Sequence, residues 1–168
     1  PGDKQLVARV VNRARSGRLV LIGSGAALID STYVVNAVEA LLAALDRCVE
    51  ARGQALVVTN GEPRPVAELL AAICRAAGAP EPTRRVPVRL ARAGGTVVES
   101  LWTLTEGLRR ERSADDPPLT RFLVDQMSTA HWFDQRMARQ VLQWEPRVSL
   151  DEGFAELQRW YSDSDSQP

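Results

Sequence analysis

The sequence predicts an α/β fold. Short β-branched or apolar runs alternate with longer patterns of helical spacing, and glycine or proline turns separate most of them. Hydrophobic residues make up 45% of the 168 positions, which is enough for one core of this class. The order of strand, turn and helix recurs without an internal sequence repeat. The chain is therefore expected to form one α/β unit.

The first elements are a helix and a strand. Residues 4–16 place apolar side chains at helical spacing, and Gly17 supplies a helix stop signal. The apolar run 19–22 predicts a short strand. Its end is marked by the turn Gly23-Ser24-Gly25.

A second extended segment, helix and strand follow. Residues 32–35 are β-branched or aromatic and predict an extended segment, after which Asn36 is placed to cap a helix over 37–51. The apolar run 54–59 predicts a buried strand. Proline near the start and glycine beyond the end predict the next helix over 65–77.

The middle of the chain predicts shorter elements. An extended piece is expected at 84–87, followed by a helix over 88–108 that two adjacent glycines weaken. Another helix is predicted over 119–127. Residues 130–133, which include two aromatic residues, predict a short strand.

Two capped helices complete the pattern. Asp134 is placed to cap a helix over 135–142. Ser149, with an acidic residue three places later, forms a capping-box sequence before a helix over 150–161. Residues 162–168 are polar and predict a disordered tail.

Composition excludes several function classes. The chain has 21 basic and 21 acidic residues, so no net field favours nucleic acid or an acidic membrane surface. No run approaches the length of a membrane span, and a cytoplasmic location is expected.

Cys48 and Cys74 lie in apolar helical patterns and predict buried structural residues. His131 has no neighbouring nucleophile and predicts a strand residue, so neither a triad nor a metal site is expected.

A set of motifs in a fixed order carries a family resemblance. They are Pro1-Gly2-Asp3, the turn at 21–25, Thr32-Tyr-Val-Val-Asn-Ala-Val-Glu-Ala40, Pro117-Pro-Leu-Thr120, and His131 to Arg139 followed by 146–153 and Trp160. Together they resemble the C-terminal half of an extended short-chain dehydrogenase/reductase, in the 3β-hydroxysteroid dehydrogenase/isomerase-like branch of the NAD-dependent epimerase/dehydratase family. Gln143 departs from the pattern, because the family usually has glycine there.

The resemblance implies a longer parent enzyme that binds NAD or NADP. Its upstream half would carry a glycine-rich phosphate loop and a Tyr-x-x-x-Lys pair, in which Tyr is the general acid/base. Neither Tyr33 nor Tyr161 is followed by the required lysine, and Lys4 is the single lysine of the chain. We therefore expect no bound cofactor and no activity from this chain alone.

The implied architecture is the C-terminal part of a Rossmann-type fold with a small, mostly helical substrate-binding lobe. This substrate-binding half would cover residues 1–161. The expected partners are a small, apolar substrate and the missing N-terminal Rossmann half, with no nucleic acid and no membrane. Apolar surface left uncovered would favour self-association.

The resemblance also places a substrate wall along the first helix and the stretch that enters Tyr33. The predicted substrate-binding residues are Asp3, Leu6, Arg9, Val10, Ile29, Asp30 and Tyr33. Nucleotide-sugar relatives commonly have arginine where Ile29 stands, so the aliphatic side chain favours an apolar, steroid-like substrate with a hydroxyl or keto group.

Two alternatives remain. One is a nucleotide-sugar epimerase or dehydratase, and the other is a non-catalytic binding module. An upstream glycine loop and Tyr-x-x-x-Lys pair would support an enzyme, whereas a start codon at this point would support the module.

Overall fold

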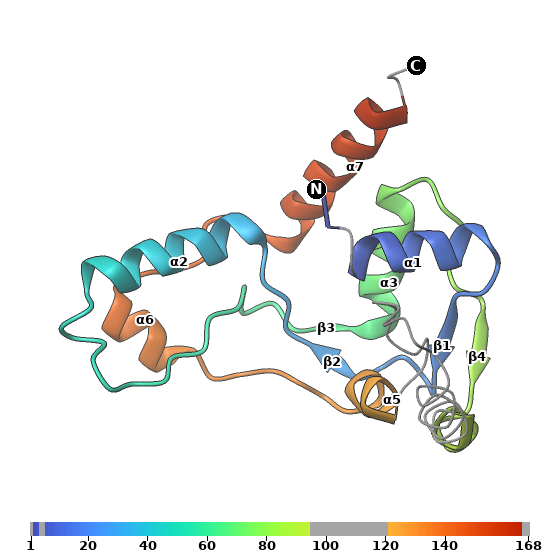
Figure 1. Cartoon of the computed structure of the whole chain (residues 1–168), viewed down its shortest axis with the longest axis horizontal. Helices are drawn as coiled ribbons and strands as arrows, with labels where there is room; N and C mark the ends of the chain where they lie inside the picture. The colour runs from blue at the N-terminus through green and yellow to red at the C-terminus, as the bar shows by residue number, and fades with distance from the viewer. Residues whose placement is uncertain (1, 4–5, 95–120, 166–168) are drawn as a thin grey trace, which may run out of the picture.

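The computed structural model describes residues 2–3, 6–94 and 121–165. In chain order the elements are α1 (Leu6–Arg15), β1 (Val20–Ile22), β2 (Leu28–Ile29), α2 (Val34–Asp46), β3 (Arg64–Pro65), α3 (Val66–Ala76), β4 (Arg84–Val86), α5 (Arg121–Ser128), α6 (Arg136–Leu142) and α7 (Leu150–Asp165). Residues 88–94 are also helical. Figure 1 shows two regions: a body built from α1, α3, α7, β1 and β4, and an arm in which α2 and α6 extend to one side.

Helix α1 covers the body because its apolar residues share one face. Val10, Val11 and Ala14 are buried against α3, and they join a core that includes Leu70 and Ile73. The helix ends where Gly17 adopts a φ of +67°, which glycine tolerates without a steric penalty. The predicted helix is confirmed over the residues that the structure describes.

The strands form two small pairs. β1 and β4 run parallel, with Val20 opposite Arg84, and β2 and β3 run antiparallel. The turn after β1 requires glycine at its end, because Gly25 has a φ of +72° and an added Cβ would lie 2.8 Å from the Cβ of Ala67. The predicted strand, turn and extended piece at 84–87 are thus confirmed.

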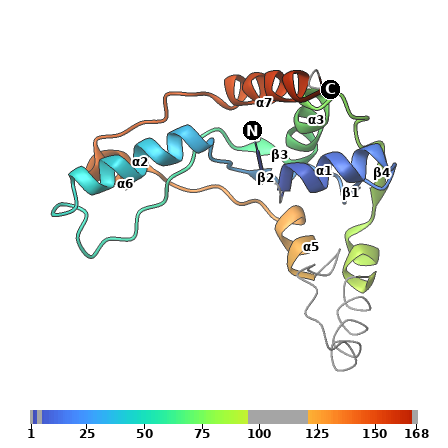
Figure 2. The same cartoon turned by 45° about the horizontal axis from the view of Figure 1, so that its top comes forward.

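Helix α3 is the centre of the body. It packs against both α1 and α7, and Cys74 on its buried face has no solvent exposure. Figure 2 shows α7 alongside α3. Leu157 of α7 is also buried. The body therefore holds helices from both ends of the described chain.

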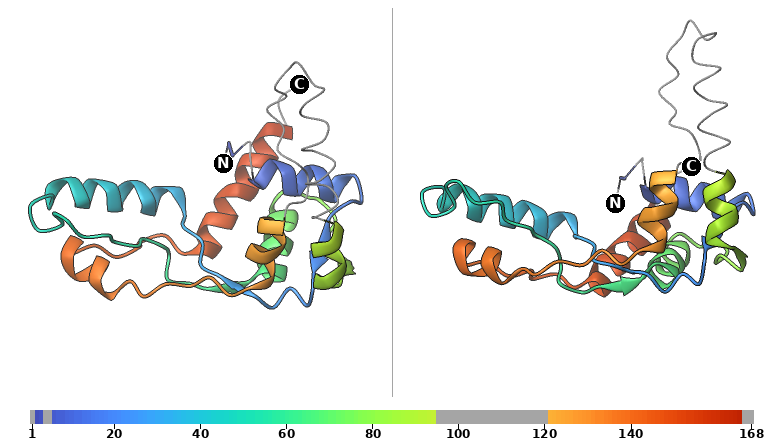
Figure 3. Two further views of the ribbon diagram at one scale, coloured as in Figure 1. Left: turned by 60° about the horizontal axis from the view of Figure 1, so that its bottom comes forward. Right: turned by 90° about the horizontal axis from the view of Figure 1, so that it is seen from below.

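The arm is held together by small residues of α2. Figure 3 shows α2 and α6 side by side in both of its views. Ala40 of α2 packs with Leu142 and Trp144, and Leu56 and Val58 of the extended segment that follows α2 border this cluster. The arm thus has a second, smaller core.

Asn36 corrects the prediction of a helix cap. Helix α2 begins two residues earlier than Asn36, at Val34, with Tyr33 as the capping residue, and it ends at Asp46 rather than near residue 51. Asn36 is fully buried, and its amide bonds to Asn60 and to the backbone of Val148. Distant polar partners, rather than the local helix end, use this side chain.

Two predicted strands are wrong in the same way. Residues 54–59 form neither helix nor strand, no ladder joins them to another described segment, and only Thr59 among them is buried. In the segment 130–133, the structure shows an isolated bridge from His131 to Ile29. Apolar runs were correctly located, but strand pairing depends on neighbours that a local pattern does not specify.

Smaller corrections concern the segment 32–35 and Cys48. Thr32 and Tyr33 precede α2, whereas the two valines that follow are its first residues. Cys48 is exposed just beyond α2, in contrast to the predicted burial, while Cys74 is buried as predicted.

Of the two predicted helix caps in the C-terminal part, the structure confirms Ser149, whereas the capping residue of α6 (Arg136–Leu142) is Gln135 rather than Asp134. Ser149 Oγ accepts the backbone N–H of Glu152, and Glu152 Oε2 accepts the backbone N–H of Ser149 at 2.8 Å, so the capping box is confirmed. Asp134 Oδ1 accepts the backbone N–H of Arg136 at the start of α6. Helix α7 continues to Asp165, past its predicted end at 161. The predicted segments within 95–120 lie outside the described residues.

Candidate functional site

A cavity of about 570 Å³ lies where α1, the stretch 29–34, α3 and α7 meet. Leu6 and Val7 of α1 form one side, and Leu69, Leu70 and Ile73 of α3 form another. Its size falls within the range of small-molecule sites in proteins. The apolar side chains of α1 and α3 therefore form two walls of this cavity in addition to packing in the body core.

The lining of this cavity is mainly apolar. Met127 of α5 and Phe154 and Leu157 of α7 complete the apolar wall. Asp3 is the one charged side chain among the lining residues that the structure describes, and no basic side chain lines the cavity there. An apolar molecule therefore fits this lining better than an anion does.

Tyr33 contributes a large aromatic surface to the cavity. Its backbone N–H donates to Asn60 Oδ1 at 2.9 Å, which fixes the chain at this point. Its ring lies against Gly153 of α7, where an added Cβ would come within 2.8 Å of Tyr33 Cδ2. Both residues line the cavity.

The structure brings together four of the seven predicted substrate-binding residues. Asp3, Leu6, Ile29 and Tyr33 line the cavity beside α1. Asp3 also has a structural role, because its Oδ2 accepts the backbone N–H of Val7 at 2.9 Å in the first turn of α1.

The other three predicted residues lie elsewhere. Val10 is buried in the body core, since it occupies the face of α1 that meets α3. Arg9 is exposed and does not line the cavity. Asp30 points to a second cavity, because successive residues of an extended chain face opposite sides.

Sequence reasoning did not select the cavity residues of α3, α5 and α7. Their signal was an apolar stripe at helical spacing, which is also the signal of an ordinary core face. Leu70 belongs both to the buried core and to the cavity lining. Periodicity alone therefore could not separate a ligand wall from packing.

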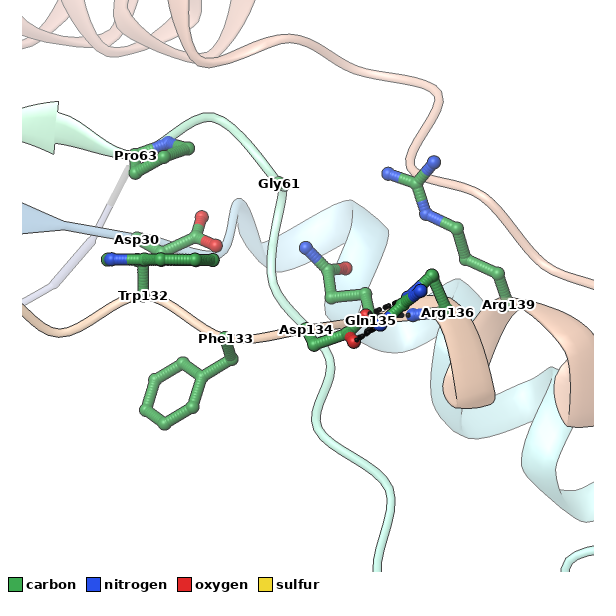
Figure 4. A pocket seen from close by; sticks show the side chains of 9 residues that line it. All are labelled: Asp30, Gly61, Pro63, Trp132, Phe133, Asp134, Gln135, Arg136 and Arg139. Atoms are coloured by element: carbon green, nitrogen blue, oxygen red, sulfur yellow. Dashed lines mark hydrogen bonds and ion pairs between the residues drawn. The ribbon is translucent and has the colours of Figure 1, made fainter.

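The second cavity, of about 550 Å³, lies beside the arm and is drawn in Figure 4. Asp30 and the ring of Trp132 lie close together there, with Phe133 beside them. Trp132 is 61% exposed. Thr59 Oγ1 donates to Asp30 Oδ2 at 2.7 Å. The site is open, and aromatic and charged groups share its lining.

Arg136 does not offer an uncompensated charge to this second cavity. Its Nε donates to Asp134 Oδ1 at 3.0 Å, and its Nη2 donates to Asp134 Oδ2 at 2.6 Å. These hydrogen bonds, together with one from the Arg136 backbone, lower the pKa of Asp134 to about 2. An anionic ligand would therefore compete with an existing ion pair.

His131 and Tyr161 do not line the apolar cavity. His131 Nε2 lies 2.8 Å from Thr129 Oγ1 and is held by a backbone bridge. Tyr161 packs against the body core, and burial raises the pKa of its phenol. Within the described ranges no group of three potential metal ligands occurs, and none of the helices there is long and apolar enough to cross a bilayer.

Comparison with known proteins identifies the family. The chain is 39% identical over 160 residues to a 2-alkyl-3-oxoalkanoate reductase of Stenotrophomonas maltophilia, which covers 94% of this chain and 47% of the reductase. It is 32% identical over 162 residues to 3beta-hydroxysteroid-dehydrogenase/decarboxylase isoform 1 of Arabidopsis thaliana, covering 92% of this chain and 36% of that protein. The chain corresponds to the C-terminal part of a 3β-hydroxysteroid dehydrogenase-like, extended short-chain dehydrogenase/reductase.

A solved structure shares the fold of this chain. The dTDP-glucose 4,6-dehydratase of Bacillus anthracis, in complex with NAD, matches 98% of this chain and 41% of its own length with a TM-score of 0.54 and 15% identity. The predicted fold class, the C-terminal part of a Rossmann-type structure, is therefore confirmed. The chain spans about half the length, or less, of the relatives that it matches. No protein-family model matches it.

Proposed function

We propose that the protein to which this chain belongs is an NAD(P)-dependent oxidoreductase that acts on a hydroxyl or keto group of an apolar molecule. In this proposal the chain supplies the wall that binds the apolar part of the substrate. The observation that carries it is the apolar cavity formed by α1, α3 and α7 around Tyr33. Homology to reductases and dehydrogenases supports the oxidoreductase class.

The names of the relatives support an apolar substrate, namely a large hydrocarbon that carries a hydroxyl or keto group. One relative is named for 2-alkyl-3-oxoalkanoates and another for 3β-hydroxysteroids. Either kind of molecule carries extensive apolar surface, whose removal from water favours binding by about 25 cal/mol per Å². Leu70, Phe154 and Leu157 offer matching surface.

We propose that catalysis and cofactor binding belong to the part of the protein outside this chain. This chain has no Tyr-x-x-x-Lys pair and no glycine-rich phosphate loop, so the proton-transfer residues and the dinucleotide site would belong to the rest of the protein. We expect this chain alone to bind neither NAD nor NADP and to have no activity.

The cavity chemistry disfavours a nucleotide sugar. A diphosphate needs cationic or N–H donors, and arginine provides two parallel donors in one side chain. Ile29 lines the cavity at the position where nucleotide-sugar relatives commonly have arginine. With Asp3 also in the lining, the described wall would repel phosphate.

The outer face of α2 supports a covering partner within the same longer protein. Its small residues, such as Ala40, face α6, whereas Val38, Leu41 and Leu45 lie on the opposite side and are largely exposed. A helix that is apolar on all sides is normally buried on all sides. Residues 55–58, of which Leu56 and Val58 border the α2 cluster, have no strand partner among the described segments. The proposed occupant is the Rossmann half that this chain does not contain.

A matched pair of variants tests the proposed function in the complete protein. Leu6 and Leu90 are exposed to similar extents, 60% and 65%, but only Leu6 lines the cavity. Leu6→Asp places a carboxylate in the apolar wall and is expected to raise the KM for a 2-alkyl-3-oxoalkanoate or a 3-ketosteroid about tenfold. Leu90→Asp is expected to leave that KM unchanged.

The assay follows NAD(P)H consumption with these ketones and, separately, turnover of UDP- and dTDP-sugars. Turnover of nucleotide sugars alone would contradict the proposal. So would equal effects of the Leu6 and Leu90 variants on KM, because the cavity would then have no special part in binding.

A further inference from the structure

The body and the arm meet at a buried pair of asparagines. Asn36 Nδ2 donates to Asn60 Oδ1 at 2.9 Å and to the backbone carbonyl of Val148 at 2.7 Å. Asn36 Oδ1 accepts the backbone N–H groups of Arg147 and Val148, both at 3.1 Å. Both asparagines are buried, so these bonds are shielded from water. We call Asn36 and Asn60 the asparagine clamp.

The clamp connects two walls of the apolar cavity. Asn60 Oδ1 accepts the backbone N–H of Tyr33 on one wall, and Asn60 Nδ2 donates to Val148 just before α7 on the other. The start of α7 is held further by Glu62 Oε1, which accepts the N–H of Leu150. The backbone of Tyr33 and the first turns of α7 are therefore fixed relative to each other.

Gly153 lies in this fixed part of α7 and lets the ring of Tyr33 approach the helix. The residue is buried, it is the fourth residue of α7 with its N–H bonded to the carbonyl of Ser149, and its φ is not positive. Its backbone conformation therefore does not require glycine, and alanine is the better helix former. The contact that does require glycine is the Tyr33 ring, because a Cβ would lie 2.8 Å from Cδ2 and 3.2 Å from Cε2.

We propose that Gly153 determines the width of the apolar cavity by seating the ring of Tyr33, and that it thereby selects the size of the substrate's apolar part. This inference rests on the proposed function. An alanine at 153 cannot coexist with the present ring position, since the clamp prevents the Tyr33 backbone from moving away. The ring must then turn, and as a lining residue it changes the space inside the cavity.

A stability cycle on this chain tests the contact without any assay of activity. The variants are Gly153→Ala, Tyr33→Leu and the double variant, each measured by thermal unfolding. Gly153→Ala is expected to lower the midpoint in the presence of Tyr33 and to raise it in the Tyr33→Leu background. Ala155→Gly, at an exposed position of the same helix, calibrates helix propensity and is expected to change the midpoint equally in both backgrounds.

Substrate size is tested in the complete protein with a series of ketones from short-chain 3-oxoalkanoates to 3-ketosteroids. Gly153→Ala is expected to change kcat/KM for the largest ketone at least tenfold relative to the smallest, mainly through KM. An equal change for all sizes would overturn the proposal, as would an additive stability cycle. Absence of turnover with every ketone would contradict the proposed function, and size selection with it, whereas the stability cycle would still report on the contact.

Discussion

Asn36 uses all of its hydrogen-bonding capacity in the clamp. Its amide nitrogen donates to two acceptors and its oxygen accepts two backbone N–H groups. From the sequence, an asparagine before a run of helical residues predicts a cap. Its partners at 60 and 147–148 lie far away in the chain, and local pattern carries no information about them. The residue type was thus informative, while its role depended on the tertiary fold.

Removal of this amide should be costly. Asn36→Ala removes the acceptor of the backbone N–H groups of Arg147 and Val148, and each buried donor left unpaired costs roughly 1–3 kcal/mol. We expect the free energy of unfolding to fall by about 3 kcal/mol, measured by urea denaturation. Asn12→Ala, at an exposed position of α1, should change it by less than about 0.5 kcal/mol. Equal effects would mean that the clamp adds nothing to stability.

Asp134 gives a prediction that depends on pH. Its pKa of about 2 in the folded chain lies below the ordinary value of 3.8, chiefly because the Arg136 side chain donates hydrogen bonds to the carboxylate. A lowered pKa stabilises the folded state above pH 3.8, and this contribution disappears as the pH falls toward 2.

Carbon-13 NMR titration of the Asp134 carboxyl measures this pKa directly. Arg136→Gln should raise the pKa part of the way toward 3.8, since the backbone N–H of residue 136 remains as a donor. Arg139→Gln is the control, because Arg139 pairs with Glu145 instead, and it should leave the Asp134 titration in place. A pKa that Arg136→Gln does not move would show that the ion pair is not formed in solution.

At the scale of elements, helices that bury one apolar face were predicted well. α1 and α3 follow their periodicity and their glycine or proline boundaries closely. α2 is apolar on all sides, so its pattern gave no clear boundary, and its start and end were misplaced. The run 54–59 was predicted as a strand from its apolar residues, yet a ladder needs a neighbouring strand that the described chain does not supply.

The candidate site was predictable only in part. The family resemblance located Leu6, Ile29 and Tyr33 on the cavity wall, but it could not show that Val10 faces the core instead. The cavity residues of α7 belong to the apolar stripe of that helix. Such a stripe indicates that its side chains are buried, but it does not show whether they contact another helix or a cavity. Which stripe borders an empty space is a property of the packed elements.

The end of α6 provides a prediction at the same scale. Gln143 has a φ of 50° and a ψ of 41°, the left-handed conformation that costs a side chain roughly 1–2 kcal/mol relative to glycine. Gln143 therefore adopts the left-handed conformation although it stands where the family usually has glycine. Gln143→Gly should raise the free energy of unfolding by about 1 kcal/mol in urea denaturation.

The control for this change is Gln140→Gly, at an exposed position inside α6. There glycine should destabilise by about 1 kcal/mol, because the backbone is helical and gains nothing from the substitution. Destabilisation by both substitutions would contradict the left-handed end of α6.

At the scale of the whole molecule, the exposed face of α2 should cause self-association of this chain. Leu41 and Leu45 are 70% and 69% exposed, and contiguous apolar surface of this kind marks an interface. Sedimentation velocity should give an average mass that rises above 18.4 kDa with concentration. The double variant Leu41→Glu, Leu45→Glu should sediment as a monomer at the same concentrations.

Leu90→Glu is the matched control, since Leu90 is similarly exposed outside α2. It should leave the association unchanged. Association that persists in the double α2 variant would assign the interface to another surface. In the complete protein the proposed Rossmann half would cover α2, so the double variant should there lower stability rather than improve solubility.

The parallel pairing of β1 with β4 bears on the order in which the body folds. Val20 and Arg84 meet across a long intervening chain that includes α2 and α3. Closing so long a loop is entropically slow unless the helices between have already docked. We therefore expect α1 and α3 to form the folding nucleus and β4 to join late, so that substitutions in β4 accelerate unfolding while leaving the refolding rate nearly unchanged.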